Sequence, residues 1–231
     1  MFNRSVFNLY ILFLPTIIKS QNNLNEIKLD FSKWELFVGY EFSIPNIKTL
    51  EFTYNLDDNE ARHGLIIKNS YDKNTDYLLR TCPIAENFSY RLGNSNNGSQ
   101  SEKMSYELKV DTDNINQTLY YKYALVLEKS LIDTFSVHQS KFRILIHLND
   151  ELLHKPFVIH SNSSDKFLNL VTKPNRNIVW RDWKVEYLEL SKFNLGDKLR
   201  VEFETYDCKG GQAFGYAYLV TGLKNYKYPV K

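Results

Sequence analysis

Apolar and polar residues alternate along much of the chain after residue 21. Residues 106–110 read Tyr-Glu-Leu-Lys-Val, a period of two. Residues 142–148 repeat the pattern in part, and residues 199–203 set Leu, Val and Phe against Arg and Glu. This alternation is typical of antiparallel strands that cover a core with one face and meet water with the other.

Other apolar runs are more continuous. Leu119 to Leu127 is rich in Tyr, Leu and Val, which predicts a strand buried on both faces. Further strands are predicted over residues 51–54, 179–190 and 214–220. Polar turn segments separate the runs, at residues 93–99, 111–114, 161–165, 173–175 and 195–197. Many strands with short polar connections predict an all-β, antiparallel β-sandwich.

No sustained helical period, internal repeat or linker appears after residue 21, so residues 22–231 are expected to form a single β-sandwich domain. Residues 1–20 have the character of a signal peptide. Arg4 precedes an apolar run over residues 6–18, which is short for a membrane span, and Ser20 with Gln21 gives a cleavage point. An uncleaved anchor or a buried first helix is the alternative. The chain is therefore expected to be secreted or displayed at the cell surface.

The composition fits a packed domain. The 231 residues are 43% hydrophobic and include 16 Tyr and 15 Phe, which favour strands. The formal net charge is +2, and removal of residues 1–20 takes away Arg4, Lys19 and no acid, which leaves zero. No basic stripe indicates binding to nucleic acid or to an anionic membrane. No later run reaches membrane-span length, so no span is expected in the mature chain.

The cysteines and the glycosylation sequons do not by themselves indicate a functional site. Cys82 and Cys208 are the only cysteines. The sequence leaves two alternatives, a disulfide between them or two buried free thiols. Beyond residue 20, four Asn-x-Ser/Thr sequons make the protein a possible glycoprotein, at Asn87, Asn97, Asn116 and Asn162.

Four segments together resemble a family of jelly-roll-like extracellular modules. These modules occur in cell-surface and secreted proteins, mainly of Bacteroidota, often beside PKD-type or adhesin repeats. The segments are Asp30-Phe-Ser-Lys-Trp34, Ser89-Tyr-Arg-Leu-Gly-Asn94, Leu119 to Glu128 with Gln139 to Phe142, and Asp182-Trp183 leading to Asp207-Cys208 and Phe214-Gly-Tyr-Ala-Tyr218. Their order and spacing hold across roughly residues 30–222.

The resemblance implies an extracellular jelly-roll-like, galactose-binding-like sandwich with a ligand-binding or adhesive role. It implies no enzymatic activity. The chain departs from the family at Ala213, where His is usual, and near residues 154–158, where the family often has a second cysteine. A family disulfide is therefore not carried over.

The block from Asp207 to Tyr218 has two interpretations. Its glycines let the backbone approach a ligand closely, and Asp207 could then contact a metal or a sugar hydroxyl. The preferred interpretation is structural: the glycines serve a turn or bulge, and Phe214, Tyr216 and Tyr218 pack on alternate faces of a core strand. Asp207, Tyr216 and Tyr218 are thus candidate ligand-binding residues of low rank.

Aromatic side chains are the usual platform for sugar rings. Trp34, Trp180 and Trp183 are candidates, although core packing is favoured for each. Trp180 and Trp183 are three apart, so in a regular strand one is expected in the core and the other at the surface.

No cofactor is expected, although calcium is possible. Oxygen ligands could come from Asp111, Asp113 and Asn114, or from Asp57, Asp58 and Glu60, but a solvated turn is favoured.

Three functions follow, in falling order. The first is a secreted module that binds a glycan or another surface polymer, through a face lined by one Trp or several Tyr. The second is an adhesion domain that contacts an extracellular protein without a small-ligand site. The third is a secreted polysaccharide hydrolase or lyase, which needs acids or an acid and a His converging in one cleft. No Gly-x-Ser-x-Gly elbow or zincin helix is present, so no catalytic or metal residue is assigned.

Overall fold

The computed structural model describes residues 33–40, 43–49, 61–67, 70–131, 138–163 and 168–225. The expected signal peptide, the strand at residues 51–54 and the loop acids at residues 57–60 lie outside these ranges. Thirteen strands are described: β1 (Trp34–Gly39), β2 (Ile47–Thr49), β3 (His63–Ile66), β4 (Ser89–Leu92), β5 (Ser101–Lys109), β6 (Thr118–Lys129), β7 (Lys141–Leu148), β8 (Glu151–Leu152), β9 (Phe157–His160), β10 (Asn169–Lys173), β11 (Arg176–Glu189), β12 (Lys198–Tyr206) and β13 (Gly215–Lys224). Two short 3₁₀ turns complete the set, η2 (Lys73–Thr75) and η4 (Leu190–Lys192).

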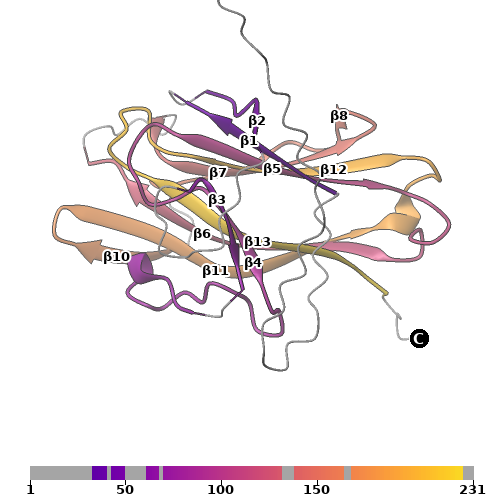
Figure 1. The fold of residues 1–231 in the computed structure, drawn as a ribbon, viewed down its shortest axis with the longest axis horizontal. Helices are drawn as coiled ribbons and strands as arrows, with labels where there is room; N and C mark the ends of the chain where they lie inside the picture. The colour runs from indigo at the N-terminus through magenta and orange to yellow at the C-terminus, as the bar shows by residue number, and fades with distance from the viewer. Residues whose placement is uncertain are drawn as a thin grey trace, which may run out of the picture. The chain divides into compact units, whose positions relative to one another are not determined.

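The strands form two antiparallel sheets. Sheet A has the order β2-β1-β5-β12-β7-β8, with β9 also paired to β7, and sheet B has the order β10-β11-β6-β13-β4-β3. Consecutive strands often change sheet, as in β5, β6 and β7 or β11, β12 and β13, which makes the fold a jelly-roll sandwich. Figure 1 shows β1, β5 and β12 in one layer and β6, β11 and β13 in the other. The expected fold class is confirmed.

Aromatic side chains fill the space between the sheets. Trp34 of sheet A packs on Tyr90 of sheet B with ring centroids 5.0 Å apart. Tyr123 of sheet B stacks on Phe142 of sheet A at 5.4 Å. These contacts follow from the period of two in each strand, because alternate side chains point toward the facing sheet.

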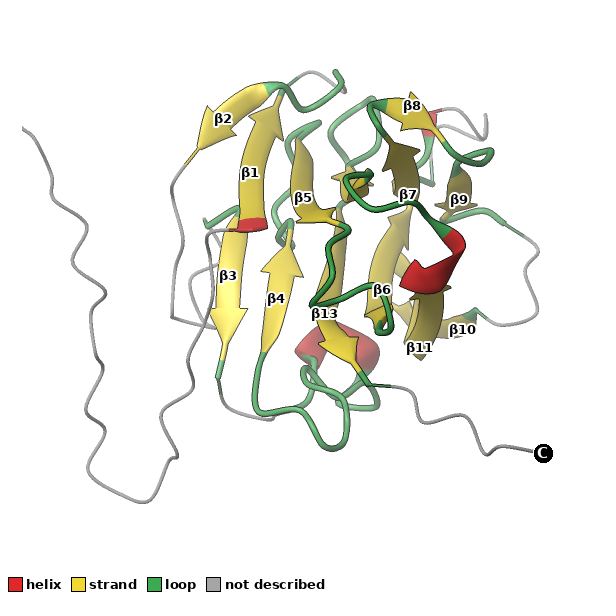
Figure 2. Ribbon diagram, turned by 90° about the vertical axis from the view of Figure 1, so that its right-hand side faces the viewer, coloured by secondary structure: helices red, strands yellow, loops and turns green. Residues whose placement is uncertain are grey.

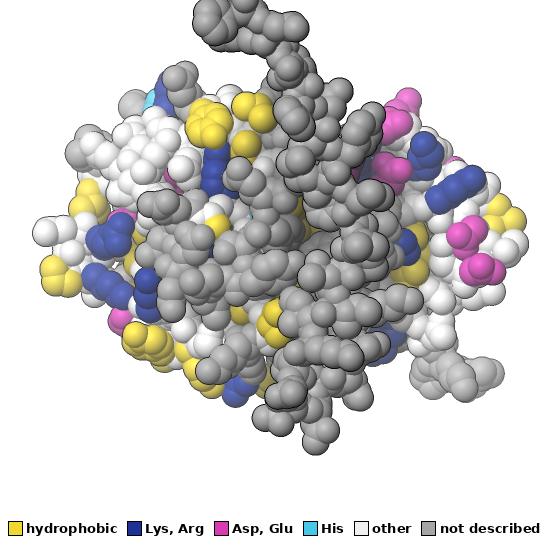
Figure 3. All heavy atoms as spheres, viewed as in Figure 1, with side chains coloured by type: hydrophobic (Ala, Val, Ile, Leu, Met, Phe, Trp, Pro, Cys, Tyr) yellow, Lys and Arg dark blue, Asp and Glu magenta, His cyan; other side chains and the backbone are white. Residues whose placement is uncertain are grey.

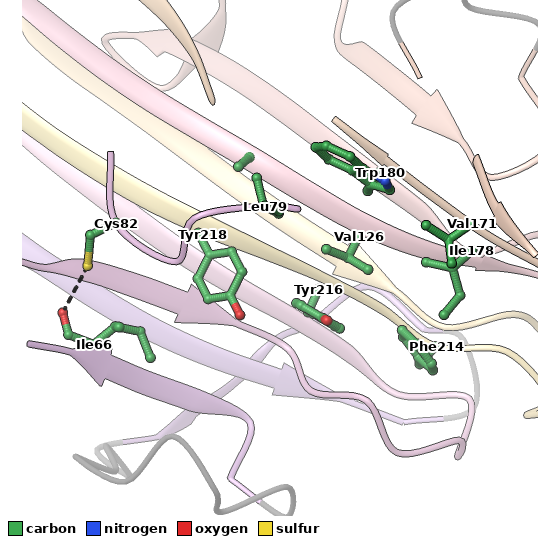
Figure 4. Packing of buried hydrophobic residues seen from close by; sticks show 11 residues of the cluster. Ile66, Leu79, Cys82, Val126, Val171, Ile178, Trp180, Phe214, Tyr216 and Tyr218 are labelled. Atoms are coloured by element: carbon green, nitrogen blue, oxygen red, sulfur yellow. Dashed lines mark hydrogen bonds between the residues drawn. The ribbon is translucent and has the colours of Figure 1, made fainter. Parts of the chain in front are cut away.

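A second apolar layer covers the outer face of sheet B. The segment between β3 and β4, which we call the strap (residues 70–88), lies over this face and inserts Leu79 and Cys82. Together with Ile66, Ala124, Val126, Val171, Ile178, Trp180, Phe214, Tyr216 and Tyr218 they form one buried cluster (Figure 4). Strand β6 is therefore buried on both faces along most of its length, as its continuous apolar sequence predicts.

A buried carboxylate holds the strap in place. Asp72 accepts hydrogen bonds of 2.7 Å from the hydroxyls of Tyr216 and Tyr218, and a third from the backbone N–H of Asn74. The indole N–H of Trp183 donates to the carbonyl of Arg80 in the strap at 2.9 Å. Figure 2 shows β3, β4, β13, β6 and β11 side by side in the sheet that the strap covers.

Candidate functional site

Most of the residues singled out from the sequence are interior side chains. Trp180, Asp207, Tyr216 and Tyr218 are all buried. The hydroxyls of Tyr216 and Tyr218 donate hydrogen bonds to Asp72 inside the second apolar layer. The four side chains therefore offer a ligand no exposed surface, and the structural interpretation of this block is the one that the structure supports.

Two expectations about side-chain direction are corrected. Phe214, Tyr216 and Tyr218 do not pack on alternate faces but share one cluster, because residues two apart in a strand point the same way. Trp180 and Trp183 also face the same cluster rather than opposite sides. The register of β11 against β6 shifts between Arg181 and Lys184, and this irregularity adds the extra residue that returns Trp183 to the face of Trp180.

Asp207 is a structural acceptor. Its two carboxylate oxygens accept the backbone N–H groups of Gln100 and Gly215, at 2.9 and 3.0 Å. Burial, and then the nearby carboxylate of Glu102, raise the pKa of Asp207 to about 8. A Cβ at Gly215 would stand 2.8 Å from the carbonyl oxygen of Tyr206. Residue 215 is therefore a glycine because the backbones of β12 and β13 pass close together there, and not because a ligand approaches it.

The two cysteines are buried and free, so the disulfide that the sequence left open does not form. Cys82 lies in the second apolar layer, where its thiol faces the carbonyl of Ile66. Cys208 is instead in the turn before β13, where its sulfur accepts the N–H groups of Gln212 and Ala213.

The polar loop that could supply calcium ligands is a hydrogen-bonded turn. Asp111 accepts the backbone N–H groups of Asp113 and Asn114, and Asn114 accepts that of Asp111. Within the described ranges no three acids, histidines or cysteines group as metal ligands. All four sequon asparagines, Asn87, Asn97, Asn116 and Asn162, are exposed, so each is sterically open to a glycan.

One exposed aromatic surface remains on sheet B, beside the edge of the strap. Tyr120 of β6 and Tyr187 of β11 are direct cross-strand partners and point outward. Tyr187 is 48% exposed, and Val185, two residues earlier on the same face, is 36% exposed. We call these three residues with Gly222 the tyrosine platform.

Gly222 sets the angle of the platform. It is the β13 partner of Tyr120, and a Cβ built on it would lie 2.7 to 3.0 Å from the hydroxyl and ring atoms of Tyr120. The Tyr120 ring therefore lies across the bare backbone of Gly222 rather than standing upright from the sheet. Any side chain at residue 222 would have to displace that ring.

Polar groups border the platform. Lys122 pairs with Glu86 of the strap at 2.5 Å, and its ammonium lies 5.4 Å from the centre of the Tyr120 ring. Burial, and then Glu86 and Tyr187, raise the pKa of Tyr120, which keeps its hydroxyl protonated and able to donate. An apolar ring surface with a carboxylate, an ammonium and hydroxyls at its border can stack on an apolar ligand face and hydrogen-bond the polar groups around it.

The platform was missed by sequence reasoning. Both tyrosines fall in predicted strands, but nothing in the sequence aligns residue 120 with residue 187 or places a glycine beneath them. The richness of residues 119–127 in Tyr was the available signal, and it was interpreted as core.

No family model matches the chain, and no curated protein matches it. Among solved structures it is similar to TmCBM61 in complex with β-1,4-galactotriose, with a TM-score of 0.36, 8% identity, and 84% of this chain and 90% of that chain covered. It is also similar to CBM27-1 of Caldicellulosiruptor saccharolyticus in complex with mannohexaose, with a TM-score of 0.31, 14% identity, and 74% and 87% covered. No helix among the described residues has the length and apolar character to cross a membrane.

Proposed function

We propose that the protein is an exported binding protein that recognises a glycan through the tyrosine platform. One observation carries the proposal: Tyr120 and Tyr187 are neighbouring outward-facing rings, one of them laid across Gly222, on a sheet face whose other half the strap covers. An extended aromatic surface of this kind stacks on the apolar face of a pyranose. The hydroxyls and the Lys122–Glu86 pair supply hydrogen bonds to the ring substituents.

The acids Glu204 and Asp207 and the interior histidine His63 give no support to catalysis. Glu204 accepts the hydroxyl of Tyr206 on the outer face of sheet A, whereas Asp207 accepts two backbone N–H groups. His63 lies in the interior, where burial lowers its pKa to about 4. A binding role needs none of them to reach a substrate.

The test is an array of neutral oligosaccharides probed with the purified protein, with β-1,4-galactotriose and mannohexaose included as first probes. Wild type is compared with Tyr187→Ala, and the matched control is Tyr77→Ala, which removes an even more exposed tyrosine from the strap. Truncation at residue 187 should weaken binding at least about tenfold, or roughly 1.4 kcal/mol. Equal binding by the two variants, or no binding by wild type, contradicts the proposal.

A second function, protein adhesion, is favoured by one apolar patch. Tyr77, Leu78 and Leu170 are all well exposed, and the contacts of Lys173 with Lys73 and Asp76 bring β10 against this part of the strap. Figure 3 shows apolar side chains gathered near the edge where β10 and the strap lie in Figure 1. Self-association measured by light scattering, abolished in Leu78→Ser, would support this role.

A further inference from the structure

Strand β10 ends sheet B and has a neighbouring strand on one side only. It pairs with β11, and in the described sheet no strand follows it on the other side. Figure 2 shows β10 at the end of the row of strands, beside β11. Its five residues make it longer than the other described edge strands, which are β2 with three residues, β8 with two, and β9 and β3 with four each.

The turn between β10 and β11 decides which backbone groups point to the free side. The ladder closes at Lys173 and Arg176, around the two-residue turn 174–175. In such a hairpin the residues that flank the turn form a hydrogen-bonded pair, and every second residue along the ladder repeats it. The N–H and C=O groups of Leu170 and Thr172 therefore point away from β11, toward the free edge.

These outward backbone groups have no partner among the described residues. Neither Leu170 nor Thr172 makes a backbone hydrogen bond outside its ladder with β11. Both residues are exposed, Leu170 to 58%. Natural proteins protect a strand edge with a proline, a bulge or a charged residue in the strand, and residues 169–172 contain none of these. The edge is therefore open to the addition of another strand.

The edge is complementary to itself. When two copies of β10 lie antiparallel about a two-fold axis at Val171, Leu170 of each copy faces Thr172 of the other, and these residues exchange both backbone hydrogen bonds. The two Lys173 ammonium groups then lie at opposite ends of the pair, roughly 14 Å apart along the strands. Each of them is also paired with Asp76 of its own strap at 2.9 Å. No like charges meet in this arrangement.

Apolar side chains flank the edge on both faces of the sheet. Val171 points to the strap face, where it belongs to the second apolar layer, so its neighbour Leu170 points to the opposite face. On the strap face Tyr77 and Leu78, 67% and 62% exposed, directly follow Asp76, which contacts β10. A second copy brings this surface already ordered, whereas a free peptide would lose conformational entropy on pairing. A second copy is thus the occupant that the edge favours.

We infer that β10 is a dimerisation edge, where it pairs antiparallel with β10 of a second copy and joins two six-stranded sheets into one. A five-residue strand with these flanking side chains makes a contact of about 1,000 Å², the small end of specific interfaces, so the dimer should dissociate in the micromolar range.

The dimer names a partner for the adhesive candidate function and does not depend on the glycan site. The two-fold axis of an antiparallel edge pair is perpendicular to the sheet, so the outer faces of both sheets B lie on the same side. If the glycan proposal holds, the two tyrosine platforms then bind one polymer bivalently.

The first test is sedimentation velocity of the purified protein from about 1 to about 300 µM, a range that spans the affinity of a small interface. Wild type should pass from monomer to dimer. Thr172→Pro removes an outward N–H and leaves the β11 ladder intact, so it should weaken dimerisation at least about tenfold. The matched control Thr172→Val keeps that N–H and should dimerise within about twofold of wild type. Urea melts of both variants show whether the fold is kept.

Cysteine cross-linking tests the register, independently of any loss of stability. Val171 faces its own copy across the axis with Cα atoms about 4.5 Å apart, so Val171→Cys should form a disulfide-linked dimer under mild oxidation. The two copies of residue 172 lie roughly 8 Å apart, beyond disulfide range, so Thr172→Cys should stay monomeric on a denaturing gel. Wild type is the control for Cys82 and Cys208, which are both buried.

Three results overturn the inference. They are a wild type that stays monomeric at the highest concentration, a Thr172→Pro variant that dimerises as wild type does, and cross-linking of Thr172→Cys as readily as of Val171→Cys. Self-association that Leu78→Ser abolishes and Thr172→Pro spares would keep adhesion through the strap and remove the β10 pairing. Tyr187→Ala should dimerise normally and Thr172→Pro should bind a short oligosaccharide normally, so failure of the glycan site and failure of the dimer give different results.

Discussion

The acid Asp207 makes the stability of the protein fall as pH rises, in a range where most carboxylates do not titrate. Its pKa is raised from 3.8 to about 8, first by burial and then by Glu102. In the unfolded chain the same group ionises near 4. Between these values the folded protein holds a proton that the unfolded chain has released, so raising the pH favours unfolding. The free energy of unfolding therefore falls as the pH rises from about 4 to about 8, and below pH 4 Asp207 causes no loss.

The magnitude follows from linkage. A carboxyl that is protonated when folded and ionised when unfolded lowers the free energy of unfolding by about 1.4 kcal/mol per pH unit. The window from about pH 7 to 8 isolates Asp207 best, because the pKa of Glu102 is raised only to about 6, and because His63, with a folded pKa of about 4 and an unfolded pKa near 6.5, is mostly neutral in both states above pH 7. Partial ionisation of the folded protein reduces the expected slope there to about 1 kcal/mol per pH unit.

The assay is urea unfolding at several pH values across that window, for wild type, Asp207→Asn and the control Asp113→Asn, which neutralises an exposed acid. Wild type and Asp113→Asn should both lose about 1 kcal/mol per pH unit, and Asp207→Asn should lose much less. A wild-type stability that is flat or rises with pH refutes the assignment. So does a slope in Asp207→Asn equal to that of wild type.

Three further results are expected. Tyr218→Phe should lower the free energy of unfolding by about 1.5 to 3 kcal/mol, because it removes a hydrogen bond to a buried carboxylate, and urea melts will measure it. Leu79→Ala should cost about 2 to 5 kcal/mol by leaving a cavity under the strap, whereas Leu78→Ala, next to it and exposed, should cost under about 0.5 kcal/mol; equal losses would contradict the placement of the strap. Cys82 and Cys208 should resist a thiol reagent in the native protein and both react in denaturant, and failure of either to react when unfolded would contradict the free thiols.

Much of the fold could be predicted from the sequence because one face of each strand has to be apolar. The alternation at residues 106–110 falls at the end of β5 and just beyond it, and that at residues 199–203 falls in β12. The unbroken apolar run at residues 119–127 indicated a strand buried on both faces, and β6 is covered by sheet A on one side and by the strap on the other. Local pattern is enough for such statements.

The candidate sites depend on register, which local pattern does not carry. Nothing in the sequence pairs Tyr120 with Tyr187 on one side and with Gly222 on the other. The irregularity near Trp183 likewise reverses a side-chain direction that strict alternation would assign. The strap explains why Phe214, Tyr216 and Tyr218 are all buried on one face of β13, because a loop that packs on the outer face of a sheet turns that face into core.

The most direct test of the proposed function is a backbone amide NMR titration of the labelled protein with the neutral oligosaccharide that binds best on the array. We expect shifts confined to the neighbourhood of Tyr120, Tyr187 and Gly222 on β6, β11 and β13, lost in Tyr187→Ala. Shifts centred on any other surface, or none at saturating oligosaccharide, would contradict the tyrosine platform as the glycan site.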